Sequence, residues 1–171
     1  MKLMPVLLVA LTIAALSSGC ADPGAAASGV QTHTLSSRAT GVPRLELDLP
    51  TGFHVRRHEG PDFDVFYFRD TKRNASLGVY VGQHPGLHSN ESELTDITRV
   101  AGHVGNASVE WLHWRESGDY HSEALIKGFY GTPEAAGNTS FGGLLLHVFA
   151  QAPTSEQLSA LEAAASSLRL K

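Results

Sequence analysis

The chain has 171 residues, with 13 Lys or Arg, 17 Asp or Glu and a formal net charge of −4. It contains no run of like charges, which argues against a basic footprint for nucleic acid or for an anionic membrane surface. We therefore expect no nucleic-acid partner.

The first 19 residues have the pattern of a secretory signal peptide. Lys2 is followed by an apolar run from Leu3 to Leu16, and this run is too short for a membrane-spanning helix, which needs about 20 residues. Small residues follow at positions 17–19, as at a cleavage site. We expect residues 1–19 to be removed from the mature protein.

Cys20 is the only cysteine in the chain. The sequence LSSGC, which ends at Cys20, resembles the lipobox of bacterial lipoproteins, although Ser17 stands where that family favours leucine and Leu16 lies one position further back. The resemblance implies diacylglycerol on the Cys20 sulfur, cleavage just before it and acylation of the new amino group. Two or more acyl chains anchor a protein stably in a membrane. Lipidation also converts the Cys20 thiol, which is easily oxidised, into a thioether. The alternative is ordinary cleavage that leaves a free thiol.

The resemblance places the protein in a bacterial cell envelope, held by its lipid anchor, and in the outer membrane if the cell has two membranes. Residues 20–43 are rich in Ala, Gly, Ser, Thr and Pro and have no aromatic residue. This composition predicts a flexible tether because it cannot bury enough apolar surface to offset the entropy of ordering. Residues 44–171 are then expected to form a single domain.

Within that domain, several segments are predicted to be strands. Residues 45–49 alternate apolar and acidic side chains, the period of a half-buried strand. Aromatic and β-branched residues fill 63–68 and 76–82, and residues 142–152 form a late apolar segment typical of a central strand. Residues 93–100 are predicted to form a short helix.

Residues 108–115 and 119–130 are predicted to form a hairpin around a two-residue turn at Ser117 and Gly118. In that register Trp114 pairs with His121, and His113 faces the other side of the sheet.

The clearest helix is predicted at the end of the chain. Thr154 is a candidate N-cap, with Gln157 three residues later as in a capping box. One face then carries an apolar stripe: Leu158, Leu161, Ala165 and Leu168. We expect an α+β domain, with a mostly antiparallel sheet and this C-terminal amphipathic helix packed on one of its faces.

Two features of the domain resemble the PsbP/Mog1-like group, which includes bacterial lipoproteins. One is the LPxGF-type entry formed by Leu49, Pro50, Gly52 and Phe53, and the other is a last apolar strand that runs into a terminal helix ending in SSLRL. The resemblance implies a binding or accessory role, with no catalytic residue that matches a position here.

Candidate metal ligands are His84 and His88, four residues apart in HPGLH. Pro85 and Gly86 disfavour a helix that would place both imidazoles on one face, and a closed zinc site needs four ligands. We therefore expect no metal and no cofactor. The alternative is a small hydrolase or metal-dependent enzyme that uses these loop histidines.

All four asparagines lie in N-x-S triplets: Asn74, Asn90, Asn106 and Asn138. In a eukaryotic secreted protein such triplets accept glycans, so a secreted soluble glycoprotein is a second alternative. The leading interpretation is a membrane-anchored envelope lipoprotein that acts without catalysis, as an accessory or binding module for an unidentified envelope protein or ligand.

Overall fold

The computed structural model describes residues 29–36, 44–87, 94–130 and 144–171. Its largest element is a seven-stranded sheet in the order β3-β4-β5-β9-β8-β7-β6, in which every neighbouring pair is antiparallel. The strands are β3 (His54–Glu59), β4 (Phe63–Asp70), β5 (Ala75–Gly82), β6 (Thr95–Val104), β7 (Ala107–Glu116), β8 (Asp119–Tyr130) and β9 (Leu144–Ala152).

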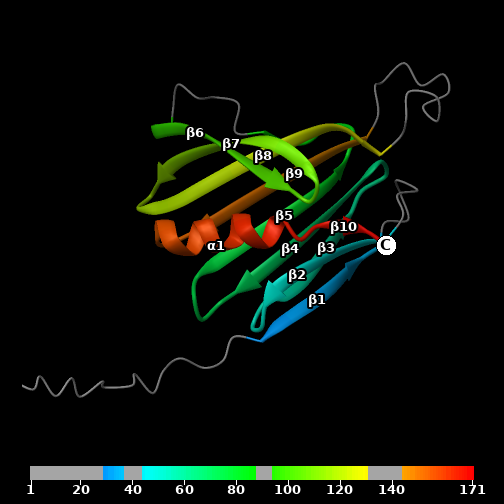
Figure 1. The fold of residues 1–171 in the computed structure, drawn as a ribbon, viewed down its shortest axis with the longest axis horizontal. Helices are drawn as coiled ribbons and strands as arrows, with labels where there is room; N and C mark the ends of the chain where they lie inside the picture. The colour runs from blue at the N-terminus through cyan, green and yellow to red at the C-terminus, as the bar shows by residue number, and fades with distance from the viewer. Residues whose placement is uncertain (1–28, 37–43, 88–93, 131–143) are drawn as a thin grey trace, which may run out of the picture.

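A smaller sheet and the helix lie together on one side of this large sheet (Figure 1). The smaller sheet has the order β1-β2-β10, with β1 (Val30–Leu35), β2 (Leu45–Pro50) and β10 (Arg169–Leu170). Helix α1 (Ser155–Ala165) contacts β2 of the small sheet and β5, β6, β8 and β9 of the large one. The predicted fold class, a mostly antiparallel sheet with a C-terminal helix on one face, is confirmed.

The hydrophobic core fills the space between these layers. We call the side of the seven-stranded sheet that faces α1 the core face, and the opposite side the outer face. Side chains alternate between the two because the period of a strand is two residues. The core face, the small sheet and the helix contribute buried residues that include Phe66, Phe68, Leu77, Val79, Trp111, Leu146, Val148, Leu45, Leu47, Leu49, Leu158 and Leu161.

Strand β1 lies within the segment that was expected to be a flexible tether, so that prediction is wrong for residues 30–35. β1 pairs with β2 over six residues, from Val30 opposite Pro50 to Leu35 opposite Leu45. Leu35 is 1% exposed, and His33 is buried, with its ring in a T-shaped contact with the Phe68 ring. Burial lowers the pKa of His33. Strand β2 supplies the backbone hydrogen bonds of β1. Burial of only two side chains is therefore enough to order β1, although its composition predicts coil.

Strand β6 replaces the short helix predicted for residues 93–100. The segment pairs with β7, with an irregularity between Thr95 and Thr98, where Asp96 has a positive φ of 56°. The four β-branched residues of this stretch, Thr95, Ile97, Thr98 and Val100, fit a pleated strand better than a helix. Tertiary pairing thus determines the structure here.

The predicted hairpin is confirmed in its register. Arg115 pairs with Tyr120, and Trp114 pairs with His121. Ser117 (φ 53°) and Gly118 (φ 92°) both have left-handed backbones, which is the geometry of a type I′ turn. The Trp114 and His121 rings are stacked, with centroids 5.3 Å apart, as expected.

The terminal helix follows its predicted pattern. The Thr154 hydroxyl accepts a hydrogen bond from the backbone N–H of Gln157 at 3.3 Å. Leu158, Leu161 and Ala165 are buried, and Leu168, just beyond the end of α1, completes the stripe.

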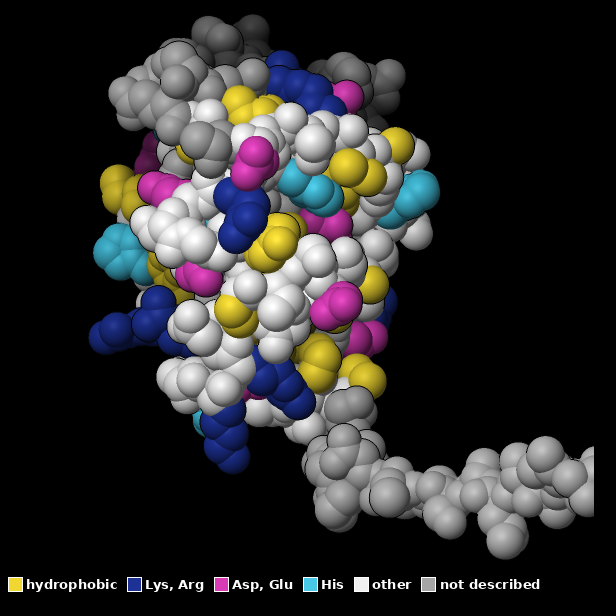
Figure 2. All heavy atoms as spheres, turned by 90° about the vertical axis from the view of Figure 1, so that its left-hand side faces the viewer, with side chains coloured by type: hydrophobic (Ala, Val, Ile, Leu, Met, Phe, Trp, Pro, Cys, Tyr) yellow, Lys and Arg dark blue, Asp and Glu magenta, His cyan; other side chains and the backbone are white. Residues whose placement is uncertain are grey.

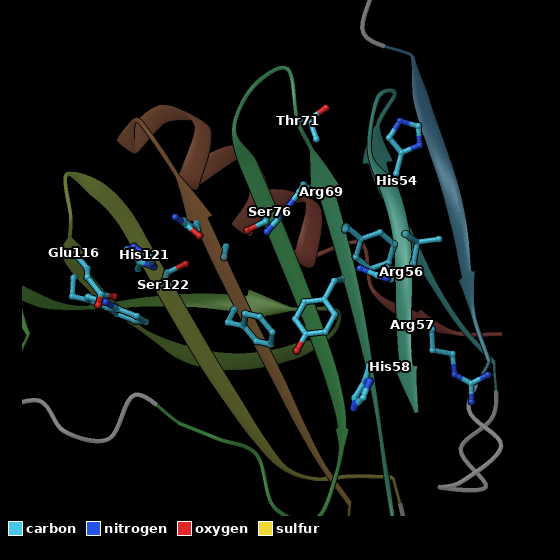
Figure 3. Close-up of a pocket in the computed structure, with 17 residues that line it drawn as sticks. His54, Arg56, Arg57, His58, Arg69, Thr71, Ser76, Glu116, His121 and Ser122 are labelled. Atoms are coloured by element: carbon cyan, nitrogen blue, oxygen red, sulfur yellow. The ribbon is translucent and has the colours of Figure 1, made fainter. Parts of the chain in front are cut away.

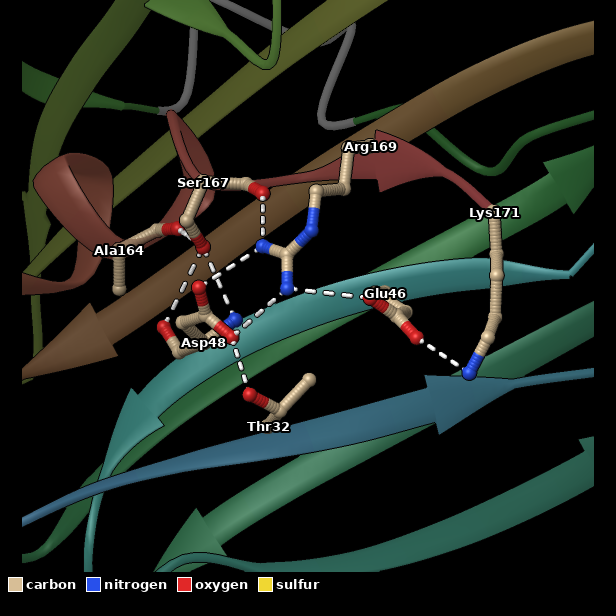
Figure 4. Close-up of polar contacts among 7 residues, drawn as sticks. All are labelled: Thr32, Glu46, Asp48, Ala164, Ser167, Arg169 and Lys171. Carbon is tan, nitrogen blue, oxygen red and sulfur yellow. Dashed lines mark hydrogen bonds and ion pairs between the residues drawn. The ribbon is translucent and has the colours of Figure 1, made fainter.

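Polar contacts tie the C-terminal strand β10 to the small sheet (Figure 4). The Arg169 guanidinium reaches Asp48 at 2.7 Å and Glu46 at 3.1 Å, and Lys171 reaches Glu46 at 2.8 Å. Thr32 of β1 donates to Asp48 at 2.6 Å. The end of the chain is therefore linked to both β1 and β2.

Candidate functional site

The outer face of the seven-stranded sheet carries a broad hollow with a volume of about 1040 Å³. In Figure 3 the sheet is seen from this side, with α1 behind it. The labelled residues come from β3, β4, the turn after β4 and β5 on one side, and from β7 and β8 on the other. Ligand pockets typically measure about 300–1,000 Å³, so the hollow is large enough for a small molecule.

Aromatic rings form part of the floor of this hollow. Tyr67 of β4 and Phe149 of β9 meet edge to face, with centroids 6.0 Å apart, and both line the hollow. Gly78 of β5 lies between them in the sheet and pairs with each. The Phe149 ring occupies the space where a Cβ at position 78 would project. This glycine therefore lets an aromatic ring lie flat against the sheet.

Basic side chains line the hollow on the β3–β4 side. By register, His54 lies opposite Arg69, and Arg56 lies opposite Tyr67. Directly paired residues share a face, and so do residues two apart on one strand, so all of these side chains belong to the outer face, as does His58. All five residues line the hollow, and all are exposed.

The β7–β8 side of the hollow has a different chemistry. It carries the stacked pair of Trp114 and His121, together with Glu116. Gln151 of β9 donates to Asp119 at 2.8 Å and lines the hollow beside these residues. The hollow thus runs from a basic side, across an aromatic floor, to a polar side that carries a carboxylate.

The charged groups on the core face are paired instead. Arg57 reaches Asp64 at 2.7 Å and Glu59 at 3.0 Å, and the hydrogen bond to Asp64 raises the pKa of Arg57. Burial acts to raise the pKa of Asp70. Hydrogen bonds from the Arg73 side chain and from the backbone N–H groups of Arg73 and Lys72 together outweigh this effect, so the pKa lies below its usual value.

A buried pair of ionisable residues lies next to the aromatic floor. The Nε2 atom of His147 is 3.0 Å from a carboxylate oxygen of Glu123, and both residues are less than 10% exposed. The His147 and Phe149 rings are 5.2 Å apart. Neither His147 nor Glu123 lines the hollow, so this pair supports the floor and does not meet a molecule bound above it.

The residues predicted from sequence as metal ligands are not part of the hollow. His84 is exposed on the segment after β5, where its backbone N–H donates to the Tyr80 hydroxyl at 3.0 Å. His88 lies outside the described residues, as does Cys20. Within the described ranges no group of three or more His, Cys, Asp or Glu residues is arranged to hold a metal ion.

The asparagines of the N-x-S triplets that the structure describes lie on turns. Asn74 and Asn106 are exposed, in the turns between β4 and β5 and between β6 and β7, whereas Asn90 and Asn138 lie outside the described residues.

On the side of the molecule shown in Figure 2, acidic and basic side chains are interspersed. In the part of the chain that the structure describes, no helix is long and apolar enough to span a membrane.

Sequence analysis missed the basic part of the hollow, although a signal was present. In the segment HVRRHE, positions 54, 56 and 58 are all basic or imidazole residues at the two-residue period of a strand. That alternation places three such side chains on one face of β3. The aromatic contribution of Phe149 was hidden in an apolar strand.

Comparisons with known proteins found no family model, no curated protein and no solved structure that matches this chain.

Proposed function

We propose that this chain is a bacterial envelope lipoprotein of the PsbP/Mog1-like type, anchored through an acylated Cys20, whose domain binds a ligand without transforming it. The observation that carries the binding role is the hollow of about 1040 Å³ on the outer face. It combines aromatic rings with polar groups, which is the usual composition of a ligand site.

Neither the loop histidine His84 nor the buried pair of His147 and Glu123 lines the hollow. A general base must come within hydrogen-bond reach of its substrate, and the buried His147–Glu123 pair does not line the hollow. His84 is exposed on a different segment. The alternative of an enzyme that uses the loop histidines therefore has less support among the described residues than the binding role.

Cross-linking in the native envelope tests the binding role. A photoreactive benzoylphenylalanine at Ser76, which lines the hollow, is irradiated in the full chain, and the products are separated and weighed. The matched control carries the same group at Ala163, an exposed position on α1. We expect adducts from position 76 and none from position 163. Equal labelling, or no adduct at position 76, contradicts the proposal.

The anchor has a separate test. The wild-type chain is expected to partition into detergent with its mature end at an acylated Cys20, and Cys20→Ala is expected to release the protein to the soluble envelope fraction. Membrane retention of that variant contradicts the lipoprotein interpretation. Intact-mass measurement tests the alternative of a secreted soluble glycoprotein. In that case glycans at the N-x-S triplets add mass, and the lipid on Cys20 is absent.

A further inference from the structure

Two arginines on the basic side of the hollow have no carboxylate partner among the residues that the structure describes. Arg56 lies opposite Tyr67, so Arg56 and Arg69 are diagonal neighbours on the same face of β3 and β4. Such neighbours lie roughly 7–8 Å apart, within reach of each other for long side chains. No ion pair or hydrogen bond joins the side chain of either arginine to another described residue. An anion placed between two such positive charges is attracted to both of them.

Most other arginines in the described part of the chain meet an acidic group or an aromatic ring. Arg99 pairs with Glu110 at 3.0 Å, and the Arg115 guanidinium lies 4.7 Å from the centre of the Tyr120 ring. The remaining paired residues are Arg57, Arg73 and Arg169. Arg56 is adjacent to Arg57 in sequence, and both residues line the hollow, but only Arg57 forms ion pairs with described carboxylates. Among the described arginines, Arg44, Arg56 and Arg69 meet no acidic group or aromatic ring, and of these three only Arg56 and Arg69 line the hollow.

The aromatic floor begins directly beside this cationic pair. Tyr67 is the cross-strand partner of Arg56 and is 43% exposed, and its ring meets that of Phe149. A ligand that places an anionic group between the two arginines therefore places the attached atoms over Tyr67 and Phe149. Aromatic rings attract other flat rings in stacked or edge-to-face contacts.

We propose that the hollow binds a phosphate monoester whose phosphate is attached to a flat ring, with Arg56 and Arg69 on the phosphate and Tyr67 and Phe149 against the ring. Guanidinium groups recognise phosphate oxygens through paired, charge-assisted hydrogen bonds. His54, opposite Arg69, supplies a further donor at the same end. This inference rests on the proposed binding role and specifies its ligand class.

Three probes separate the contributions of charge and ring. The full chain, purified from its own envelope in detergent, is titrated by calorimetry with 1-naphthyl phosphate, 1-naphthol and inorganic phosphate, with detergent alone as the blank. We expect 1-naphthyl phosphate to bind about tenfold or more tightly than either of the others, because only it engages both the arginines and the rings. Its affinity is also expected to fall as salt is raised.

Matched variants then assign the anion site. The double variant Arg56→Gln/Arg69→Gln is expected to bind 1-naphthyl phosphate about tenfold or more weakly and to lose its preference over 1-naphthol. Arg44→Gln removes the same charge from an exposed arginine just before β2 in the small sheet, and its affinity is expected to change by less than about twofold. Circular dichroism verifies that each variant is folded.

The outcomes distinguish this inference from the proposed function. If 1-naphthol binds as tightly as 1-naphthyl phosphate, or if the double variant keeps wild-type affinity, the phosphate inference is overturned. Adducts at position 76 in the envelope would then still support a binding role for the hollow. If no probe binds and position 76 gives no adduct, both proposals are overturned.

Discussion

The two faces of the seven-stranded sheet are built from the same strands but differ in the side chains that they carry and in what those side chains contact. On the core face, apolar side chains meet α1 and the small sheet, and charged groups such as Arg57 and Asp64 are paired. On the outer face, Arg56 and Arg69 are exposed next to aromatic rings. Adjacent residues of one strand thus differ in their role, because the two-residue period assigns them to opposite faces. Substitutions that separate stability from binding test this division.

The largest effect is expected from the helix stripe on the core side. Leu161 is 3% exposed, so Leu161→Ala removes buried methyl groups and is expected to lower the free energy of unfolding by about 2–5 kcal/mol. Ala163 lies off the stripe and is exposed, so Ala163→Ser is expected to have little effect. Urea unfolding of both variants measures the difference. Similar losses from the two would show that the buried face of α1 is assigned incorrectly.

A smaller loss is expected at Asp70, which is 2% exposed and accepts hydrogen bonds from Arg73 and Lys72. Asp70→Asn is expected to cost about 1.5–3 kcal/mol at pH 7, because bonds to a charged acceptor are lost. The lowered pKa of Asp70 makes this contribution present above the unfolded-state value, about 3.9, and lost as pH falls through the lower folded-state value.

Unfolding at pH 7 and at several values below 4 checks that dependence. The difference in the free energy of unfolding between wild type and Asp70→Asn is expected to become smaller as the pH falls. Asp62→Asn, at an exposed aspartate, serves as the control. A gap that stays constant down to the lowest pH would contradict the assigned role of the ionised carboxylate.

Neighbouring arginines give the most direct contrast between the faces. Arg57→Gln removes the ion-pair partner of Asp64, whose side chain is fully buried, and is expected to cost about 1–2 kcal/mol because water reaches the partly exposed Arg57 site. Arg56→Gln is expected to change stability by less than about 0.5 kcal/mol. Thermal unfolding compares the two variants. A larger loss for Arg56→Gln would mean that the outer-face arginine supports the fold.

Gly78 tests the packing of the aromatic floor. In Gly78→Ala the new methyl group overlaps the Phe149 ring, which must move aside. We expect a loss of about 1 kcal/mol, at the low end for overpacking because the ring is partly exposed. Gly86→Ala meets no atom within 4 Å and serves as the control. Equal stability of the two variants would indicate that the ring does not rest on Gly78.

Removal of metal is expected to have no effect. A domain that depends on structural zinc unfolds when the metal is removed, since such sites contribute about 10–16 kcal/mol. We expect the thermal midpoint of the full chain to be the same before and after dialysis against a strong chelator. A large drop that zinc restores, and that His84→Ala abolishes, would favour the metal-dependent alternative.

The elements that sequence predicts well are those whose pattern is local. The α1 stripe and the Ser117–Gly118 turn depend on nearby residues, and the structure confirms both. Strand β1 and strand β6 are different, because each owes its conformation to a partner strand. Composition predicted coil for the first, and a short helix was predicted for the second. Neither argument includes the hydrogen bonds supplied by β2 and β7.

The hollow shows the same limit more strongly. The two histidines of HPGLH were candidate metal ligands because they are close in sequence, yet His84 does not line the hollow. Arg56, Arg69 and Phe149 come from three strands and meet only through the register of the sheet. Alternation in β3 could have identified its outward basic side chains. The aromatic floor beside them required the order of the strands.

Amide chemical-shift mapping tests the division between the two faces most directly. The full chain, labelled with ¹⁵N, is titrated with 1-naphthyl phosphate and its amide shifts are followed. The account predicts that the largest changes fall on β3, β4, β5 and β9 around Arg56, Arg69, Gly78 and Phe149, with little change in α1 or in the small sheet. Changes centred on α1 or on β1 and β2, or no change at saturating probe, would contradict it.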